Sequence, residues 1–542
     1  MKSNNCSLDS RPGLRYAVSM RIGPGAFSAS GGTARALRLP PTFALVLPLL
    51  RKVGLARIID EHYPIRSHAD MTHGQVVEAL ILHILQDDRR LPLYKLQEWA
   101  EKHQLHCLYG CAAQAFNDDR IARTLDALAP QAHDIHMQFV TSLLMAYHID
   151  VRAVLWDVTH VTFAGAYDQS ALIQAGYGHG VLHEKQIKLS LHVDSETGLP
   201  LNYKELAGAA NQTPLAEGFL HELQQRLGRS DLIVVSDRAG ISYENIVAYR
   251  RAQARFVAPL QATPAEVALL AELPVEAFAP LAYRSPSQPQ ERYCYHLVTL
   301  PFTRQNQREP LHVAALVIHS TQKQRDDKAK RAKILQRTVA ELDKVKGDLN
   351  KSRYAHREYA QAQLTKQIPP SLQGVVHWQL AGEDKQLSLQ YEVDEAALAQ
   401  AARADGRYLL VHNLEGSADE IFALYKRQYL VESRFRSFNS DLRVHPVWLH
   451  KEPRIEALVL IWILALTIFV LLGLLAERAE LRNPWYDHKL TARAMIELFD
   501  YATLIEISVP DQPPEYQLQL DDKQEEILAA LGIHNAHKLL NG

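Results

Sequence analysis

The stretch LIVVSDRAGISYENIVAYRRAQARFVAPL (residues 232–260) contains the pattern that decides the fold. The apolar run 232–235 has the length of a buried strand and ends in Ser236 and Asp237. Residues 243–254 then show apolar side chains at helical spacing, and residues 256–260 form another apolar run of strand length. A strand, a helix and a strand in this order are typical of a sheet that is covered by helices.

The same rhythm continues in both directions from this stretch. Upstream we predict strands at 151–156, 186–193 and 199–206, followed by a helix at 214–227. Downstream, a strand at 408–412 and a helix at about 419–440 resume the pattern after an interruption. We therefore expect an α/β fold with a mixed sheet that is split in the sequence.

The flanking segments have different patterns. Residues 41–147 predict a helical region, because apolar positions recur at spacings of three and four. Residues 1–40 are rich in glycine and lack the apolar core of a signal peptide, so we expect a flexible leader. The predicted domains are the leader (1–40), the helical N-terminal region (41–147), the two parts of the core (148–260 and 406–480), an insertion between them (261–405) and a helical C-terminal tail (481–542).

The predicted insertion combines short strands with a long charged helix at about 322–365. Residues 321–367 hold 13 Lys or Arg and 6 Asp or Glu, a local surplus of positive charge. Two interpretations stay open for this helix. It contacts the DNA backbone, or it is a solvated helix that packs on the insertion.

Charge and cysteine content exclude some classes of protein. The 59 Lys and Arg nearly balance the 61 Asp and Glu, which excludes a uniformly basic coat for nucleic acid but allows a local basic face. Four cysteines in 542 residues are too few for a disulfide-built secreted protein, and they favour a reducing cytoplasm.

Residues 457–476 read ALVLIWILALTIFVLLGLLA and carry no charge. Twenty such residues are long enough to span a bilayer, and a fully buried helix in a large core has the same composition. The sequence has no second run of this kind, and the flanks are ordinary amphipathic sequence. We therefore predict a buried core helix and no contact with a membrane.

Three carboxylates are candidates for a metal site. Asp157 and Asp237 each follow an apolar strand, a position where a single Asp is commonly a turn or cap residue. Glu432 lies on the predicted helix 419–440. Its helical face holds Tyr425, Gln428, Glu432, Arg436 and Asn439. Three converging carboxylates would form an oxygen-only site that suits Mg²⁺ or Mn²⁺, and two such ions can promote attack on a phosphodiester.

Four segments resemble the DDE transposases of bacterial insertion sequences. These segments are WDVTHVTF (156–163), KQIKLSLHVDSETGLPL (185–201), IVVSDRAGISYENI (233–246) and YKRQYLVESRFRSFNSDLRVHPVWL (425–449). The spacings of 80 and 195 residues between the three acids fit the branch with a β-rich insertion between the second Asp and the Glu. GLARIIDEHYP, GQVVEALILHIL and LPLYKLQEWAE, within residues 46–130, are similar to the helical N-terminal region of such transposases.

The resemblance implies a ribonuclease-H-like core and a catalytic triad of Asp157, Asp237 and Glu432 that holds two Mg²⁺ or Mn²⁺ ions. It also implies a protein that binds the terminal inverted repeats of its element, cleaves the DNA ends and joins them to target DNA. Such proteins act as homodimers on paired ends, in the cytoplasm at the nucleoid.

The family signature around the Glu is Tyr, two residues, Arg, three residues, Glu, six residues, Lys. Tyr425 and Glu432 match it, whereas Gln428 and Asn439 replace the two basic residues that usually contact DNA phosphate. Arg436, one turn after Glu432, is our candidate replacement for one of them. The predicted DNA contacts are Tyr425, Gln428, Arg436, Asn439, Arg427 and Arg434. The alternative function is a catalytically impaired, transposase-derived DNA-binding protein.

Overall fold

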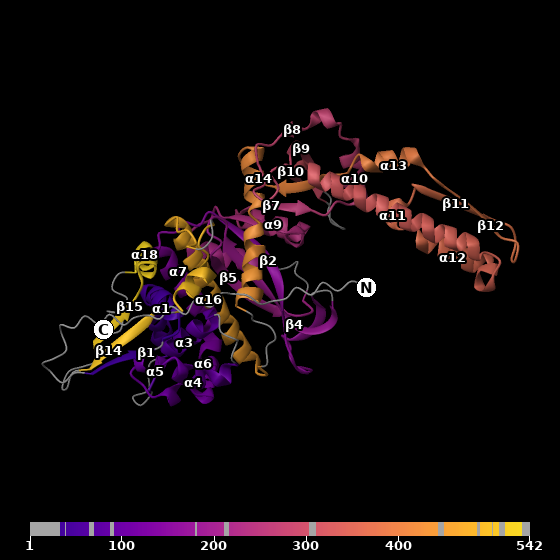
Figure 1. The fold of residues 1–542 in the computed structure, drawn as a ribbon. Helices are drawn as coiled ribbons and strands as arrows, with labels where there is room; N and C mark the ends of the chain where they lie inside the picture. Colours follow the sequence, from indigo (N-terminus) through magenta and orange to yellow (C-terminus); the bar gives the residue numbers. More distant parts are fainter. Residues whose placement is uncertain are drawn as a thin grey trace.

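The structure is a computed structural model. It describes residues 33–37, 39–63, 70–86, 92–178, 181–210, 216–302, 310–442, 449–484, 488–500, 502–508 and 515–533. A helical N-terminal region lies beside a large central sheet, and a long arm projects from the far end of that sheet (Figure 1). The predicted helical region at 41–147 corresponds to helices between Thr42 and Ala146.

A mixed sheet of ten strands forms the centre of the molecule. The strands are β2 (Ala153–Thr162), β3 (Gln174–Gly178), β4 (Val181–Asp194), β5 (Pro200–Ala207), β6 (Ile233–Ser236), β7 (Arg255–Leu260), β8 (Ala279–Pro280), β9 (Tyr293–Phe302), β10 (Leu311–Ser320) and β13 (Arg407–His412). Their order is β3-β4-β2-β6-β7-β13-β10-β9-β8, with β5 on β4. β2, β6 and β7 run parallel, and the other neighbours are antiparallel.

This arrangement is the predicted ribonuclease-H-like α/β core. The predicted strand–helix–strand unit at 232–260 is β6, α9 (Tyr243–Arg251) and β7, and α8 (Ala216–Leu227) precedes it. β6 and β7 pair in parallel because α9 carries the chain back along the sheet. Ser242 begins α9 by accepting a hydrogen bond from the Asn245 N–H at 3.1 Å.

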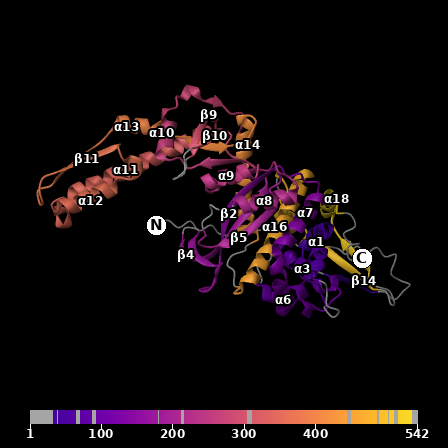
Figure 2. The ribbon, with the colours of Figure 1, turned by 180° about the vertical axis from the view of Figure 1, so that it is seen from behind.

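The N-terminal region is built from α1 (Thr42–Val53), α2 (Leu55–His62), α3 (His73–Leu85), α4 (Leu96–Lys102), α5 (Leu105–Leu108), α6 (Asp118–Leu128) and α7 (Ala132–Ala146). Of these helices, α7 packs directly on β5 of the sheet. The long helix α16 (Glu452–Arg478) lies between much of the helical region and the sheet in both views (Figures 1 and 2). It packs on α3, α6 and α7 and also on β5.

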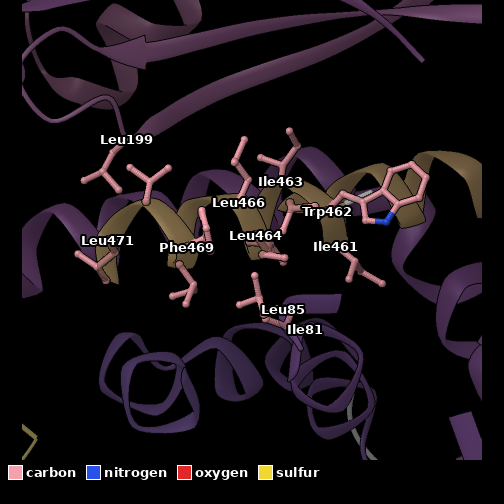
Figure 3. Packing of buried hydrophobic residues seen from close by; sticks show 14 of the residues in the cluster. Ile81, Leu85, Leu199, Ile461, Trp462, Ile463, Leu464, Leu466, Phe469 and Leu471 are labelled. Carbon is pink, nitrogen blue, oxygen red and sulfur yellow. The ribbon is translucent and has the colours of Figure 1, made fainter. Parts of the chain in front are cut away.

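α16 contains the apolar run 457–476. By length and composition it is the one described helix that could cross a membrane, yet 83% of its most apolar window is buried inside the protein. Ile81 and Leu85 of α3 lie under it, and Leu199 covers it from the side of the sheet (Figure 3). An all-round apolar helix is expected where both sides are covered. α16 is thus the core helix that joins the helical region to the sheet.

The projecting arm consists of α11 (Thr321–Asp348), α12 (Arg357–Gln367), β11 (Val376–Ala381), β12 (Ser388–Val393) and α13 (Glu395–Ala402). It has an apolar core of its own. The prediction of one helix over 322–365 is wrong in one respect. The chain turns after α11, where Asn350 and Ser352 have φ values of 65° and 46°, and α12 then packs against α11. These left-handed residues cannot belong to a continuous right-handed helix.

Not all of the predicted insertion 261–405 is in the arm, because β8, β9 and β10 continue the central sheet. The predicted helical tail 481–542 has α17 (Ala492–Leu498) and α18 (Asp522–Ala530), and also β14 (Thr503–Ser508) and β15 (Glu515–Gln519). β1 (Thr33–Leu37), within the predicted leader 1–40, pairs with β14. β14 is held extended by antiparallel pairing with β1 on one side and β15 on the other.

Candidate active site

Asp157 and Asp237 come to matching positions on neighbouring parallel strands. The last register pairs of β2 and β6 are Leu155 with Val235 and Trp156 with Ser236, and each aspartate is the next residue. Asp157 does not end its strand, contrary to the prediction, because β2 continues to Thr162 in its antiparallel pairing with β4. Only the pairing of β2 with β6 ends there, which leaves both aspartates at one edge of the parallel part of the sheet.

The turn after β6 fixes the backbone beside Asp237. The Gly240 N–H donates to the Asp237 carbonyl at 3.2 Å, and the Gly240 carbonyl accepts from Asn245 Nδ2 at 3.2 Å. A Cβ at Gly240 would overlap the side chain of Ser236. This turn can therefore fold back on the strand end only with glycine at position 240.

Glu432 reaches the same neighbourhood from a helix. The predicted helix 419–440 is in fact α14 (Ala418–Lys426), then α15 (Tyr429–Arg436) and a π turn over Ser437–Asp441. At the break, Gln428 Nε2 donates a hydrogen bond of 3.0 Å to the carbonyl of Trp156, the residue before Asp157. α15 also packs on β2 and β4 through its buried Val431 and Phe435. Glu432, one helical turn after Gln428, is exposed.

Electrostatics connect the three carboxylates. Burial is the main cause that raises the pKa of Asp157 to about 7. The negative charges of Asp237 and Glu432 add to this shift, and the Val158 N–H that donates to Asp157 Oδ1 at 2.7 Å opposes it. A carboxylate responds in this way when like charges lie close by. The structure thus brings the three predicted acids within electrostatic reach of one another.

Tyr425 and Arg238 belong to the same neighbourhood. Burial raises the pKa of Tyr425, the positive charge of Arg238 lowers it, and the charges of Glu432 and Asp237 raise it. Arg238 was not among the predicted residues. Its only signal in the sequence is its position next to Asp237, in the turn that carries the chain away from β6.

The donor set fits a hard divalent cation, since carboxylate oxygens are the ligands that Mg²⁺ and Mn²⁺ prefer. A cation here would also relieve the repulsion that raises the pKa of Asp157. In the part of the chain that the structure describes, no three His, Cys, Asp or Glu side chains are drawn together into a closed metal cage. Among the described residues the three carboxylates are therefore neighbours that form no such cage.

Several predicted DNA contacts have partners inside the protein. Arg427 forms an ion pair with Glu196, which follows β4. Arg434 is half-buried and packs across the same turn, where a Cβ at Gly198 would lie 2.5 Å from its Nη2 atom. Gln428 is bonded to β2, as described above. These three side chains hold α15 against the sheet, whereas Arg436 is exposed and Asn439 is half-buried in the π turn.

The fold and site define the class as ribonuclease-H-like proteins with acidic side chains at the edge of the sheet. A family model described as "Transposase DDE domain" matches residues 150–468, and a "Domain of unknown function (DUF4277)" matches residues 41–141. The first match covers more than half of the chain and includes Asp157, Asp237 and Glu432. The chain therefore belongs to the DDE transposase family, whose members act in DNA transposition by phosphoryl transfer and typically use divalent metal ions.

One of the solved structures that match this chain aligns with most of its length. It is described as a cryo-EM structure of a piggyBac transposase synaptic complex with hairpin DNA. The alignment covers 87% of this chain and 82% of that chain, with 11% sequence identity and a TM-score of 0.39. A search of curated proteins found no match.

Proposed function

We propose that this protein is the transposase of a bacterial insertion sequence, which binds the terminal inverted repeats of its element, cleaves the DNA ends and transfers them to target DNA. One observation carries the proposal. Asp157 and Asp237 occupy matching positions on β2 and β6, and the helix of Glu432 is tied to the same point of β2 through Gln428. A site of this kind performs phosphoryl transfer by positioning and charge stabilisation more than by acid–base chemistry of side chains.

Asp157, Asp237 and Glu432 would hold two Mg²⁺ or Mn²⁺ ions. When bound, such ions activate a water or a 3′-hydroxyl and stabilise the leaving oxygen of a phosphodiester. The protein's own contribution is orientation: Gln428 fixes α15 on β2, and the turn at Gly240 fixes the backbone at Asp237. We further propose that the helices over 41–147 recognise the inverted repeats, that two copies act on paired ends, and that the protein works on the nucleoid in the cytoplasm.

The test is a cleavage assay on labelled duplexes that carry the element's own ends, with Mg²⁺ or Mn²⁺. Asp157→Asn, Asp237→Asn and Glu432→Gln should each abolish strand cleavage and strand transfer while DNA binding persists. Glu272→Gln is the matched control, because Glu272 is an exposed acid at the end of α10 (Pro264–Glu272). If the three variants cleaved like the wild type, the proposed site would be wrong.

A second candidate function follows from Gln428 and Asn439, which stand where the family has basic residues. It is a DNA-binding protein that is derived from a transposase and no longer cleaves. Wild-type protein that binds the inverted repeats specifically but cuts them with neither metal would favour this candidate. Cleavage that depends on Asp237 would exclude it.

A further inference from the structure

The arm leaves the sheet at the same edge as the two aspartates. β13 is antiparallel to β7, with Leu409 opposite Leu260, so β13 begins where β7 ends. β10 is antiparallel to β13, with His319 opposite Arg407, and therefore ends at the same place. α11 starts directly after β10. Since β10 is three strands from β6, and neighbouring strands lie about 4.8 Å apart, α11 begins roughly 14 Å across the sheet from Asp237.

α11 is fixed firmly at this edge. Ser320 caps its first turn by accepting from the Lys323 N–H at 3.1 Å. The backbone N–H of Gly406, next to β13, donates to Asp327 Oδ2 at 3.0 Å. Further along, Arg331 forms an ion pair with Asp405, which is only 6% exposed. These contacts, and the separate apolar core of the arm, give α11 a defined direction from the active-site edge.

Four cations lie on one face of α11. Lys330, Lys333, Arg337 and Lys344 are spaced by three, four and seven residues, so they share a face, and all four are exposed. We call this set the cationic stripe. At 1.5 Å per residue it is about 21 Å long. The apolar face of the helix, with Leu342 and Val345, is turned into the core of the arm.

The cationic stripe differs from the cations around Glu432. Arg427 and Arg434 are engaged by the turn after β4. In contrast, within the part of the chain that the structure describes, no hydrogen bond or ion pair joins a stripe side chain to another residue. Between residues 330 and 344, the acid that lies closest to the stripe on the helix surface is Glu341, at the margin of the stripe. Regularly spaced cations without an internal partner suit an external polyanion.

We propose that the cationic stripe binds the phosphate backbone of the DNA duplex that is cleaved at the Asp157 and Asp237 edge. Measured along α11 from Thr321, the stripe begins after about 14 Å and ends after about 35 Å, and the longer length is about one turn of duplex. Such contacts position the DNA and carry no base specificity. This inference rests on the proposed function, because it takes the DNA to lie at that edge.

The experiment compares two double variants of the full-length protein. Lys333→Gln with Arg337→Gln removes two stripe cations. Lys328→Gln with Lys346→Gln is the control and removes the same charge. These two exposed residues are five helical turns apart, so they share one face of α11, and the helical register of 3.6 residues per turn puts that face opposite the stripe. Binding is measured on duplexes of increasing length at several salt concentrations, after thermal melting has verified that both variants are folded.

We expect the stripe variant to bind long duplexes about tenfold more weakly and to lower the slope of log K against log salt by about 1.8, the value for two lost phosphate contacts. Short duplexes that end within half a turn of the cleavage site should bind both variants equally. An equal loss in the two variants, or no loss, would overturn the proposal. If the wild-type protein bound DNA without cleaving it, and only the stripe variant lost affinity for long duplexes, the proposed activity would be contradicted. The proposal that the stripe binds DNA would still be supported.

Discussion

The raised pKa of Asp157 makes a strong prediction about stability. Its pKa of about 7 in the folded protein lies about 3 units above that of a free Asp, so its ionisation costs the fold about 4 kcal/mol. The folded state binds more protons than the unfolded chain between about pH 4 and pH 7. Stability therefore falls as pH rises through this window, and the cost is complete above about pH 7. Asp157→Asn removes the charge and keeps an oxygen that can accept from the Val158 N–H.

The variant should therefore be more stable than the wild type by about 4 kcal/mol at pH 8. At pH 5 the gain should be only about 1.5 kcal/mol, because this pH is only about one unit above the pKa of the Asp157 carboxyl in the unfolded chain. Urea denaturation in EDTA, followed by tryptophan fluorescence, measures both values, and the buried Trp156 is the adjacent reporter. Asp237→Asn is the control, since it removes one neighbouring charge and should give a smaller gain. An Asp157→Asn gain that is equal at the two pH values would refute the electrostatic account.

Three further substitutions test the scaffold of the site. Gln428→Met keeps the length of the side chain but loses the donor that ties α15 to β2, so cleavage should fall by about 5–150-fold, equivalent to 1–3 kcal/mol, while DNA affinity measured by gel shift is unchanged. Gly240→Ala should lower the urea midpoint by an amount that corresponds to about 1–3 kcal/mol, because its methyl group overlaps Ser236. Arg331→Ala leaves the buried Asp405 without its ion-pair partner and should cost about 3–5 kcal/mol, seen as faster limited proteolysis at the base of the arm.

The core could be predicted from the sequence because its signals are periodic. The unit at 232–260 and the alternating run at 186–193 appear as predicted, since each buries one whole face or both faces. β2 is longer than the predicted strand. Residues 157–162 mix polar and apolar side chains, so their sequence does not indicate a strand, and only the pairing with β4 holds them extended. The turn between α11 and α12 was missed for a similar reason: charged sequence on both sides shows no change of period there.

The site was only partly readable from the sequence. Asp157 and Asp237 could be paired because both follow apolar runs in the sequence and their spacing resembles that of a family. The role of Gln428 could not be foreseen, because its partner is a backbone carbonyl 272 residues away, and a carbonyl leaves no mark in the sequence. The position of Arg434 likewise depends on the turn at Gly198, which only the folded chain brings alongside it.

The raised pKa of Asp157, caused chiefly by burial, also depends on which residue stands at position 428. An arginine at this position, as in the family signature, would bring a positive charge beside the three acids and lower the pKa of Asp157. The neutral amide of Gln428 ties α15 to β2 without supplying that charge, so nothing at position 428 offsets the burial that raises the pKa of Asp157 to about 7. Gln428→Arg should therefore lower the pKa of Asp157 and shrink the stability gained from Asp157→Asn at pH 8, which a double-mutant cycle in EDTA measures. Additive effects of the two substitutions would show that residue 428 does not act on Asp157 through its charge.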